Sequence, residues 1–417
     1  MYPTDFGADP TGKTDSTTAF SAVVKALLAK DTGHKLADGI TDLGGATVDL
    51  GGGDYLISQP IVIPVYYGNF HFKSGTLRAS SAFPKDRFLI EIGSKSCSNG
   101  QGSCNENVGF EDMMLDSQLI AAGGLHIIAT MGANVGPQMF FLGFQNAGIR
   151  VSGGHETMIH ETWLGQYLYS DPRSSNPTAN GIELLGNDHY ITNTIVFSSR
   201  VGVLITGAAN LLTGVHTWNL ASSEGGIGIY VDAPGYTQNR LVACYLDFNS
   251  VVAVAPEHLS IVDGFFLCGG NIVLVAIPGH QTVNGLNVID NQWDQCSNNT
   301  IMLDQTQAKF TDVIDTTIES NMANPTSLLM KSTKATAKLR LENASKWQFD
   351  FNNRLLFGSI QNFGYSMVIE GNGFARHAAR AINGNIVTVE TDQPVTGTVY
   401  VWVDQSRDSQ PCGSTCK

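Results

Sequence analysis

Carboxylate and imidazole side chains that could transfer protons gather in one stretch of the chain, residues 155–247. Asp247 lies among apolar residues of a strand-like segment, where a charge needs a functional reason. Two carboxyl groups held about 6.5–9.5 Å apart can serve as general acid and base on one glycosidic bond. The spacing predicts Asp188 and Asp247 as such a pair. Glu156 is expected as an auxiliary carboxylate and His216 as the group that orients the pair.

Aromatic side chains stand close to these groups in the sequence. Trp163, Trp218 and Tyr245 occupy the outward positions of alternating segments, and large flat rings there could stack on sugar rings. His155 and Arg240 are expected as further substrate contacts, and the guanidinium could pair with a carboxylate carried by a sugar. This combination of groups favours chemistry on a polysaccharide.

A repeat of about 20 to 32 residues positions these groups, as in HETMIHETWLGQ, NDHYITNTIVFSS and AANLLTGVHTWNLA. Each unit has a polar turn, a short alternating strand and a second strand, and it cannot bury its apolar face alone. We therefore predict an all-β chain that forms a single-stranded right-handed parallel β-helix of about ten coils. Because adjacent coils lie about 4.8 Å apart, equivalent residues should form outward ladders.

The two ends of the chain depart from this repeat. Phe20, Val23 and Leu27 have helical spacing, which predicts a helix at about residues 16–30 that caps the β-helix. The β-helix with its cap should extend over residues 1–336. Residues 337–403 are expected to form a small β module packed on the helix end, and residues 404–417 a tail.

The composition excludes several classes of protein. A net charge of −13 argues against a nucleic-acid binder, which would carry a basic stripe. No segment approaches the roughly 20 apolar residues needed to cross a bilayer. Metal-ligand spacings are absent from the sequence. We expect no metal, no cofactor, no nucleic acid and no membrane partner, and a monomer.

The cysteines and sequons favour a secreted, extracellular protein. Short polar loops separate the two pairs that we expect to form disulfides, Cys97 with Cys104 and Cys412 with Cys416. Three cysteines in strand-like segments are expected as buried free thiols: Cys244, Cys268 and Cys296. N-glycosylation sequons begin at Asn298 and Asn343.

Several motifs in order carry a family resemblance, among them DFGADPTG, GGATVDLGGGDYLIS, GGHET, GVHTWN, CYLDF and TDQPVTGTV. Together they resemble the Quartet-type plant polygalacturonases, a divergent branch of the pectate-lyase-like β-helix superfamily. The resemblance implies hydrolysis of the α-1,4-galacturonosyl bonds of homogalacturonan, a pectic polysaccharide, in the plant cell wall. The signature motifs of ordinary polygalacturonases are absent, so the site residues above depend on the ladder alone.

Two alternatives stay open at this stage. The same scaffold could carry a pectate or pectin lyase that cuts by β-elimination, which needs a basic residue and usually Ca²⁺. It could also be a non-catalytic protein that binds polysaccharide. The outward ladder has few Arg or Lys side chains, which disfavours the lyase.

Overall fold

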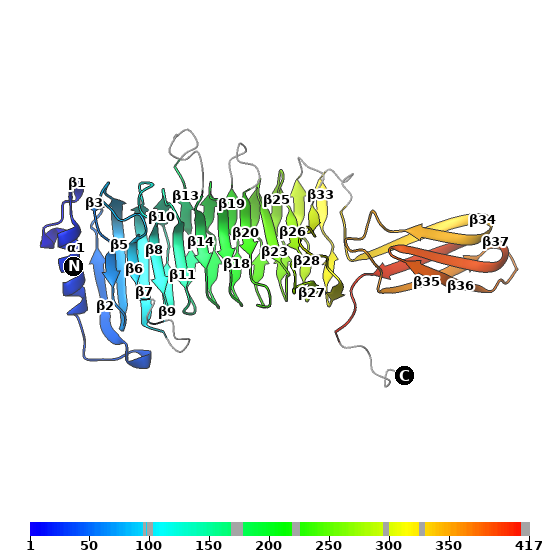
Figure 1. Ribbon diagram of the computed structural model, residues 1–417, viewed down its shortest axis with the longest axis horizontal. Coiled ribbons are helices and arrows are strands. Elements are labelled where there is room, and N and C mark those ends of the chain that lie inside the picture. Colours follow the sequence, from blue (N-terminus) through cyan, green and yellow to red (C-terminus); the bar gives the residue numbers. More distant parts are fainter. Residues whose placement is uncertain are drawn as a thin grey trace. The chain divides into compact units, whose positions relative to one another are not determined.

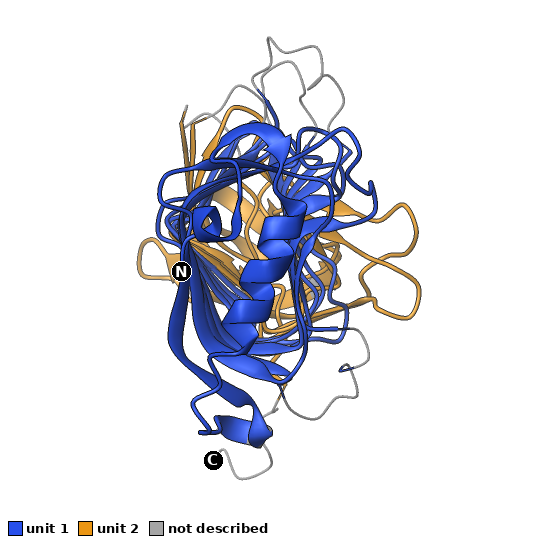
Figure 2. Ribbon diagram, turned by 90° about the vertical axis from the view of Figure 1, so that its left-hand side faces the viewer, with its two compact units in different colours: residues 1–252 blue, residues 253–417 orange. Residues whose placement is uncertain are grey.

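The computed structural model describes residues 1–94, 97, 103–167, 178–218, 226–294, 300–324 and 330–409. The chain divides into two compact units, Met1–Val252 and Ala253–Lys417, coloured separately in Figure 2. No helix among the described residues is long and apolar enough to cross a membrane. The fold is mostly β, as predicted.

A helix covers the start of unit 1. The short 3₁₀ helix η1 (Pro3–Phe6) and strand β1 (Thr11–Asp15) precede α1 (Thr17–Leu28). The Asp15 carboxylate accepts the backbone N–H of Thr17 at 2.9 Å, which satisfies one of the free donors at the helix start. Phe20 is buried on α1 and meets the Tyr55 ring edge-on, with ring centroids 5.4 Å apart. The predicted capping helix is confirmed, and Figure 2 shows it lying across the end of the unit 1 strands.

The first coils of unit 1 contain the longest strands of its β-helix. After η2 (Ala37–Gly39), the strands are β2 (Thr41–Asp49), β3 (Asp54–Ile57), β4 (Ile61–Ile63), β5 (Tyr67–Ala79), β6 (Phe88–Ile92) and β7 (Asn105–Asp116). β5 pairs in parallel with both β2 and β3, so one long strand spans two faces of the coil.

Each later coil of unit 1 has three short strands, one on each of three faces. The first face has β9 (Thr130–Val135), β12 (Met158–His160), β15 (Tyr190–Thr192), β18 (Leu211–Thr213) and β21 (Arg240–Val242). The second face has β10 (Met139–Leu142), β13 (Thr162–Gly165), β16 (Ile195–Phe197), β19 (His216–Trp218) and β22 (Tyr245–Asp247). The third face has β8 (Gly123–Ile128), β11 (Ala147–Ser152), β14 (Asn180–Leu184), β17 (Val201–Ile205) and β20 (Ile227–Val231). β23 (Ser250–Val254) contains the last residues of unit 1 and the first of unit 2.

Neighbouring coils stack in register, so the core is made of ladders of identical coil positions. On the second face, Leu164 pairs with Val196 and Thr217 with Leu246, and all four are buried. Residues on either side of this ladder point outward because side chains alternate along a strand. In Figure 1 the strands of unit 1 follow one another in chain order from blue to green. The predicted parallel β-helix is confirmed.

Unit 2 contains further parallel coils. Their strands are β24 (Ser260–Val262), β25 (Phe265–Leu267), β26 (Ile272–Val275), β27 (Thr282–Asn284), β28 (Asn287–Ile289), β29 (Gln292–Asp294), β30 (Ile301–Asp304), β31 (Asp312–Ile314), β32 (Thr317–Glu319) and β33 (Met322–Asn324). Inside these coils the Phe266 and Trp293 rings stack with centroids 4.6 Å apart.

A small antiparallel sheet follows within unit 2, made of β34 (Lys334–Asp350), β35 (Asn362–Ile369), β36 (His377–Asn383) and β37 (Ile386–Asp404). β34 and β37 pair along most of their length and lose register between Leu341 and Lys346. Trp347 and Val401 lie in the buried core of this sheet. The C-terminal β module is therefore present, while the domain boundary at residue 336 stays a prediction.

The described cysteines include both disulfide-bonded residues and a free thiol. Cys97 and Cys104 form the predicted disulfide. Cys244 is a free, buried thiol, as expected, and burial raises its pKa to about 12. Cys268 is disulfide-bonded, so its interpretation as a free thiol was wrong. It follows the end of β25 and is only half-buried, which places it outside the coil core. Three cysteines lie outside the described residues: Cys296, Cys412 and Cys416.

Candidate functional site

Two outward columns of side chains run along the second face of unit 1. The first column contains, in register, Phe140, Trp163, Ile195, His216 and Tyr245. The second column contains Leu142, Gly165, Phe197, Trp218 and Asp247. Four residues predicted for the site, His216, Trp218, Tyr245 and Asp247, thus stand on two neighbouring strands, β19 and β22. Trp163 stands on the same face, in β13.

Asp247 and His216 form a hydrogen-bonded pair at one end of these columns. His216 Nε2 lies 3.2 Å from Asp247 Oδ2. The Tyr245 ring stacks on His216 with centroids 4.4 Å apart and planes 11° from parallel. Asp247 Oδ1 is buried and has no hydrogen-bond partner among the described residues. One carboxylate oxygen is therefore held by imidazole, while the other is covered by protein and has an unused capacity to accept a hydrogen bond.

Aromatic rings continue from this pair along both columns. Phe197 lies between Trp163 and Trp218, with ring centroids 6.5 and 6.3 Å away. The Trp163 side chain is half exposed. A Cβ atom at Gly165 would stand 2.4 Å from the Phe197 ring, so glycine leaves the space that this ring fills. The result is an apolar ridge that ends at a carboxylate.

Asp188 belongs to a different group of side chains. It stands just before β15, and its carboxylate lies 3.0 Å from His155 Nδ1. The backbone N–H of Glu156 donates to the carbonyl of Asp188 at 3.1 Å. Asp188 precedes a first-face strand, whereas Asp247 ends a second-face strand two coils later. Each carboxylate has its own histidine partner, His155 for Asp188 and His216 for Asp247. Arg240 begins β21 on the first face, where it pairs with Leu211.

Comparison with known proteins decides the family. A family model described as Rhamnogalacturonase A/epimerase, pectate lyase-like, matches residues 4–229. The chain is 39% identical over 96% of its length to "Polygalacturonase QRT3" of Arabidopsis thaliana, of which it covers 83%. The chain belongs to the pectate lyase-like rhamnogalacturonase A/epimerase family. The predicted resemblance to Quartet-type polygalacturonases is confirmed, and the name of that relative, polygalacturonase, denotes a glycoside hydrolase.

Solved structures share the fold at low sequence identity. ORF18 of Geobacillus virus E2 matches with a TM-score of 0.53 and 14% identity, over 99% of this chain and 79% of that one. The A-module of mannuronan C-5 epimerase AlgE6 from Azotobacter vinelandii matches with a TM-score of 0.53 and 11% identity, over 78% of this chain and 97% of that one. At such identities these matches establish the β-helix fold of this family member and nothing about its ligand.

A second histidine, His189, directly follows Asp188 in the chain. His189 is fully buried, and its Nδ1 accepts the backbone N–H of Thr157 at 3.3 Å. Its Nε2 is buried with no hydrogen-bond partner within the described part of the chain. Burial, helped by nearby His155 and opposed by Asp188, lowers the pKa of His189 to about 4. The ring is therefore neutral at pH 7.

We expect the free energy of unfolding to fall as the pH drops from 6.5 to about 4. In this range His189 is protonated in the unfolded chain but stays neutral in the folded protein. Folding lowers the pKa of His189, so its contribution to stability is complete above pH 6.5 and is lost by about pH 4. Its size is on the order of 3 kcal/mol. Denaturant unfolding at several pH values should show a smaller drop for His189→Gln than for the wild type. Equal drops would show that another group causes the effect.

The sequence patterns missed two aromatic members of the ridge, Phe140 and Phe197. Phe197 follows Ile195 by two residues in an apolar segment, so alternation alone does not tell its outward side from its inward side. The signal lay in the repeat, because Phe197 occupies the coil position of Trp218.

The two predicted glycosylation sites do not belong to this face. Asn343 is exposed, at the irregular point of β34, with a φ of 47°. Its glycosylation stays a prediction. Asn298 lies outside the described residues.

Proposed function

We propose that this protein is a polygalacturonase that hydrolyses the α-1,4-galacturonosyl bonds of homogalacturonan. One observation carries the activity: 39% identity over 96% of the chain to a protein named polygalacturonase. The second face of unit 1 supports it with a carboxylate at the end of an aromatic ridge. A polymer could lie along this ridge because its rings repeat from coil to coil.

Asp247 is the proposed acid/base group. Its carboxyl group would exchange a proton with the glycosidic oxygen or with the attacking water, while the hydrogen bond between His216 and Oδ2 fixes the rotamer. Trp163, Trp218 and Tyr245 would support the sugar rings. Asp188, with His155 and Glu156, would contact another part of the substrate rather than share one bond with Asp247.

Secretion into the plant cell wall is part of the same proposal. The Cys97–Cys104 disulfide supports it, since disulfides persist in oxidising compartments. Mildly acidic surroundings would reduce repulsion between pectate and a chain of net charge −13.

The test is product analysis on de-esterified homogalacturonan at mildly acidic pH, with and without chelator. New reducing ends without the absorbance of unsaturated uronates would support hydrolysis. Unsaturated products that disappear with chelator would instead establish a lyase. Binding without either product would establish a non-catalytic protein.

Trp218→Ala should lower kcat/KM on polygalacturonate about tenfold, because one aromatic contact to the substrate is lost. Tyr236→Ala is the matched control, since Tyr236 is an exposed aromatic residue of unit 1 that belongs to neither column. Initial rates over a range of substrate concentrations measure the effect. An unchanged kcat/KM in Trp218→Ala would remove the ridge from the substrate path.

A further inference from the structure

The outer face of the C-terminal sheet carries aromatic and polar side chains in register. Trp402 pairs with Thr336 of β34 on one side and Gly364 of β35 on the other. Two residues earlier on β37, Tyr400 pairs with Lys338 and Ser366. Between these rows Val401 is buried in the core, so the two rows share the opposite, solvent side of the sheet.

Trp402 lies flat against the neighbouring strand. A Cβ atom at Gly364 would come within 2.5 Å of three atoms of the indole, so only glycine permits this close approach. The Trp402 side chain is nevertheless 53% exposed. One ring face thus rests on backbone while the other meets solvent. A large apolar ring held rigidly in water is the arrangement that an aromatic binding contact requires.

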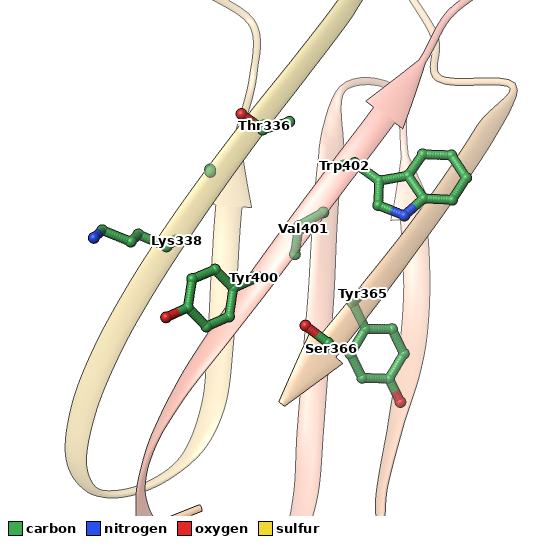
Figure 3. A pocket seen from close by; sticks show the side chains of 8 residues that line it. Thr336, Lys338, Tyr365, Ser366, Tyr400, Val401 and Trp402 are labelled. Carbon is green, nitrogen blue, oxygen red and sulfur yellow. The ribbon is translucent and has the colours of Figure 1, made fainter. Parts of the chain in front are cut away.

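Tyr400 extends this surface. It is 47% exposed and stands on the same side of β37, about 7 Å along the strand from Trp402. Figure 3 shows both rings on β37, with Lys338 on the strand to one side and Ser366 on the strand to the other. A hollow of about 470 Å³ is lined by these residues and Thr336. Hydroxyl groups and ring faces therefore border one depression.

The charge at this surface is unbalanced. Arg340, one row further along β34, pairs with Glu342 and Glu370, with N–O distances of 2.7 Å to each. Lys338 has no ion pair among the described residues. The ammonium group is thus available to an anion in a protein whose net charge is −13.

We propose that this face of the sheet is a second carbohydrate-binding site, for a segment of an oligosaccharide that contains uronic acids. Trp402 and Tyr400 would contact successive sugar rings, Lys338 a uronate carboxylate, and Thr336 and Ser366 hydroxyl groups. The choice of a uronate polymer rests on the proposed function, while the ring geometry and the lone cation are independent of it. A single cation is too little for nucleic acid, which needs a basic stripe.

Calorimetric titration of the full chain tests this site. The protein would carry Asp247→Asn so that a galacturonate hexamer is not consumed, and the second site would be removed with Trp402→Ala. We expect two bound hexamers per parent protein and one per Trp402→Ala protein. Lys338→Gln should weaken the second event about tenfold, equal to about 1.4 kcal/mol. A neutral galactose hexamer lacks the carboxylates that Lys338 would contact. Its affinity for this site of the parent protein should be no higher than that of the galacturonate hexamer for the Lys338→Gln protein.

Val368→Ala is the matched control, because Val368 is exposed on β35 and does not line the hollow. It should bind two hexamers. Identical titrations of the parent and Trp402→Ala proteins would overturn the second site, as would equal affinity for the neutral hexamer. If Trp402→Ala fails to fold, Lys338→Gln tests the site instead. An unchanged titration of the Lys338→Gln protein would then overturn the second site. Failure of the proposed function is seen separately, in the products formed by the wild-type protein.

Discussion

Asp247→Asn is expected to lower kcat on polygalacturonate by about 10²–10⁴-fold, the usual contribution of a positioned acid or base. Asparagine preserves the size of the side chain and can still accept a hydrogen bond from His216, so the fold and KM should change little. Only the proton transfer by the carboxyl group is lost. Steady-state kinetics together with unfolding curves separate the lost chemistry from lost structure.

Asp232→Asn is the control for this variant, since Asp232 is an exposed carboxylate that directly follows β20 in the same unit. It should retain full activity. Asp188→Asn should change KM more than kcat, because Asp188 is proposed to contact the substrate with His155 and Glu156 and not to transfer the proton. If Asp247→Asn keeps wild-type turnover, or if Asp188→Asn alone abolishes it, the assignment of the acid/base group is wrong.

Phe110→Ala should lower the free energy of unfolding by about 3–5 kcal/mol. Phe110 is fully buried in β7, and its ring stacks on Phe72 of β5 with centroids 5.8 Å apart and planes 14° from parallel. Truncation leaves a cavity between two coils, and a solenoid depends on such contacts between neighbours because no coil is stable alone. Denaturant unfolding followed by circular dichroism measures the loss.

Phe374→Ala provides the comparison, because that phenylalanine is 94% exposed. Its removal should change the free energy of unfolding by less than about 0.5 kcal/mol. Similar losses for the two variants would mean that stacking between coils does not stabilise this β-helix.

The coil architecture could be predicted because the repeat and the alternation agree. One buried position in four successive repeats is occupied by Leu164, Val196, Thr217 and Leu246. This alternation also fixes the outward direction of Trp163 and Asp247. His216 and Asp247 come together for the same reason, since they stand at neighbouring outward positions of consecutive coils.

The repeat alone does not decide whether Asp188 and Asp247 act as a pair. A repeat tells which residues share a coil position, but not how the chain bends between one face and the next. Asp188 precedes the first-face strand of its coil, whereas Asp247 ends a second-face strand, and only the bend decides whether such positions converge. Cys268 is a similar case, because its half-exposed place beyond β25 depends on where that strand ends.

Mass analysis of products formed in water labelled with heavy oxygen tests the central claim most directly. Hydrolysis breaks the bond between C1 and the bridging oxygen, so each new reducing end of homogalacturonan should carry one labelled oxygen. The account predicts this label in products of the wild-type protein and its near absence with Asp247→Asn over the same time. New chain ends without label would mean elimination, in which the bridging oxygen stays on C1, and would contradict the proposed hydrolase.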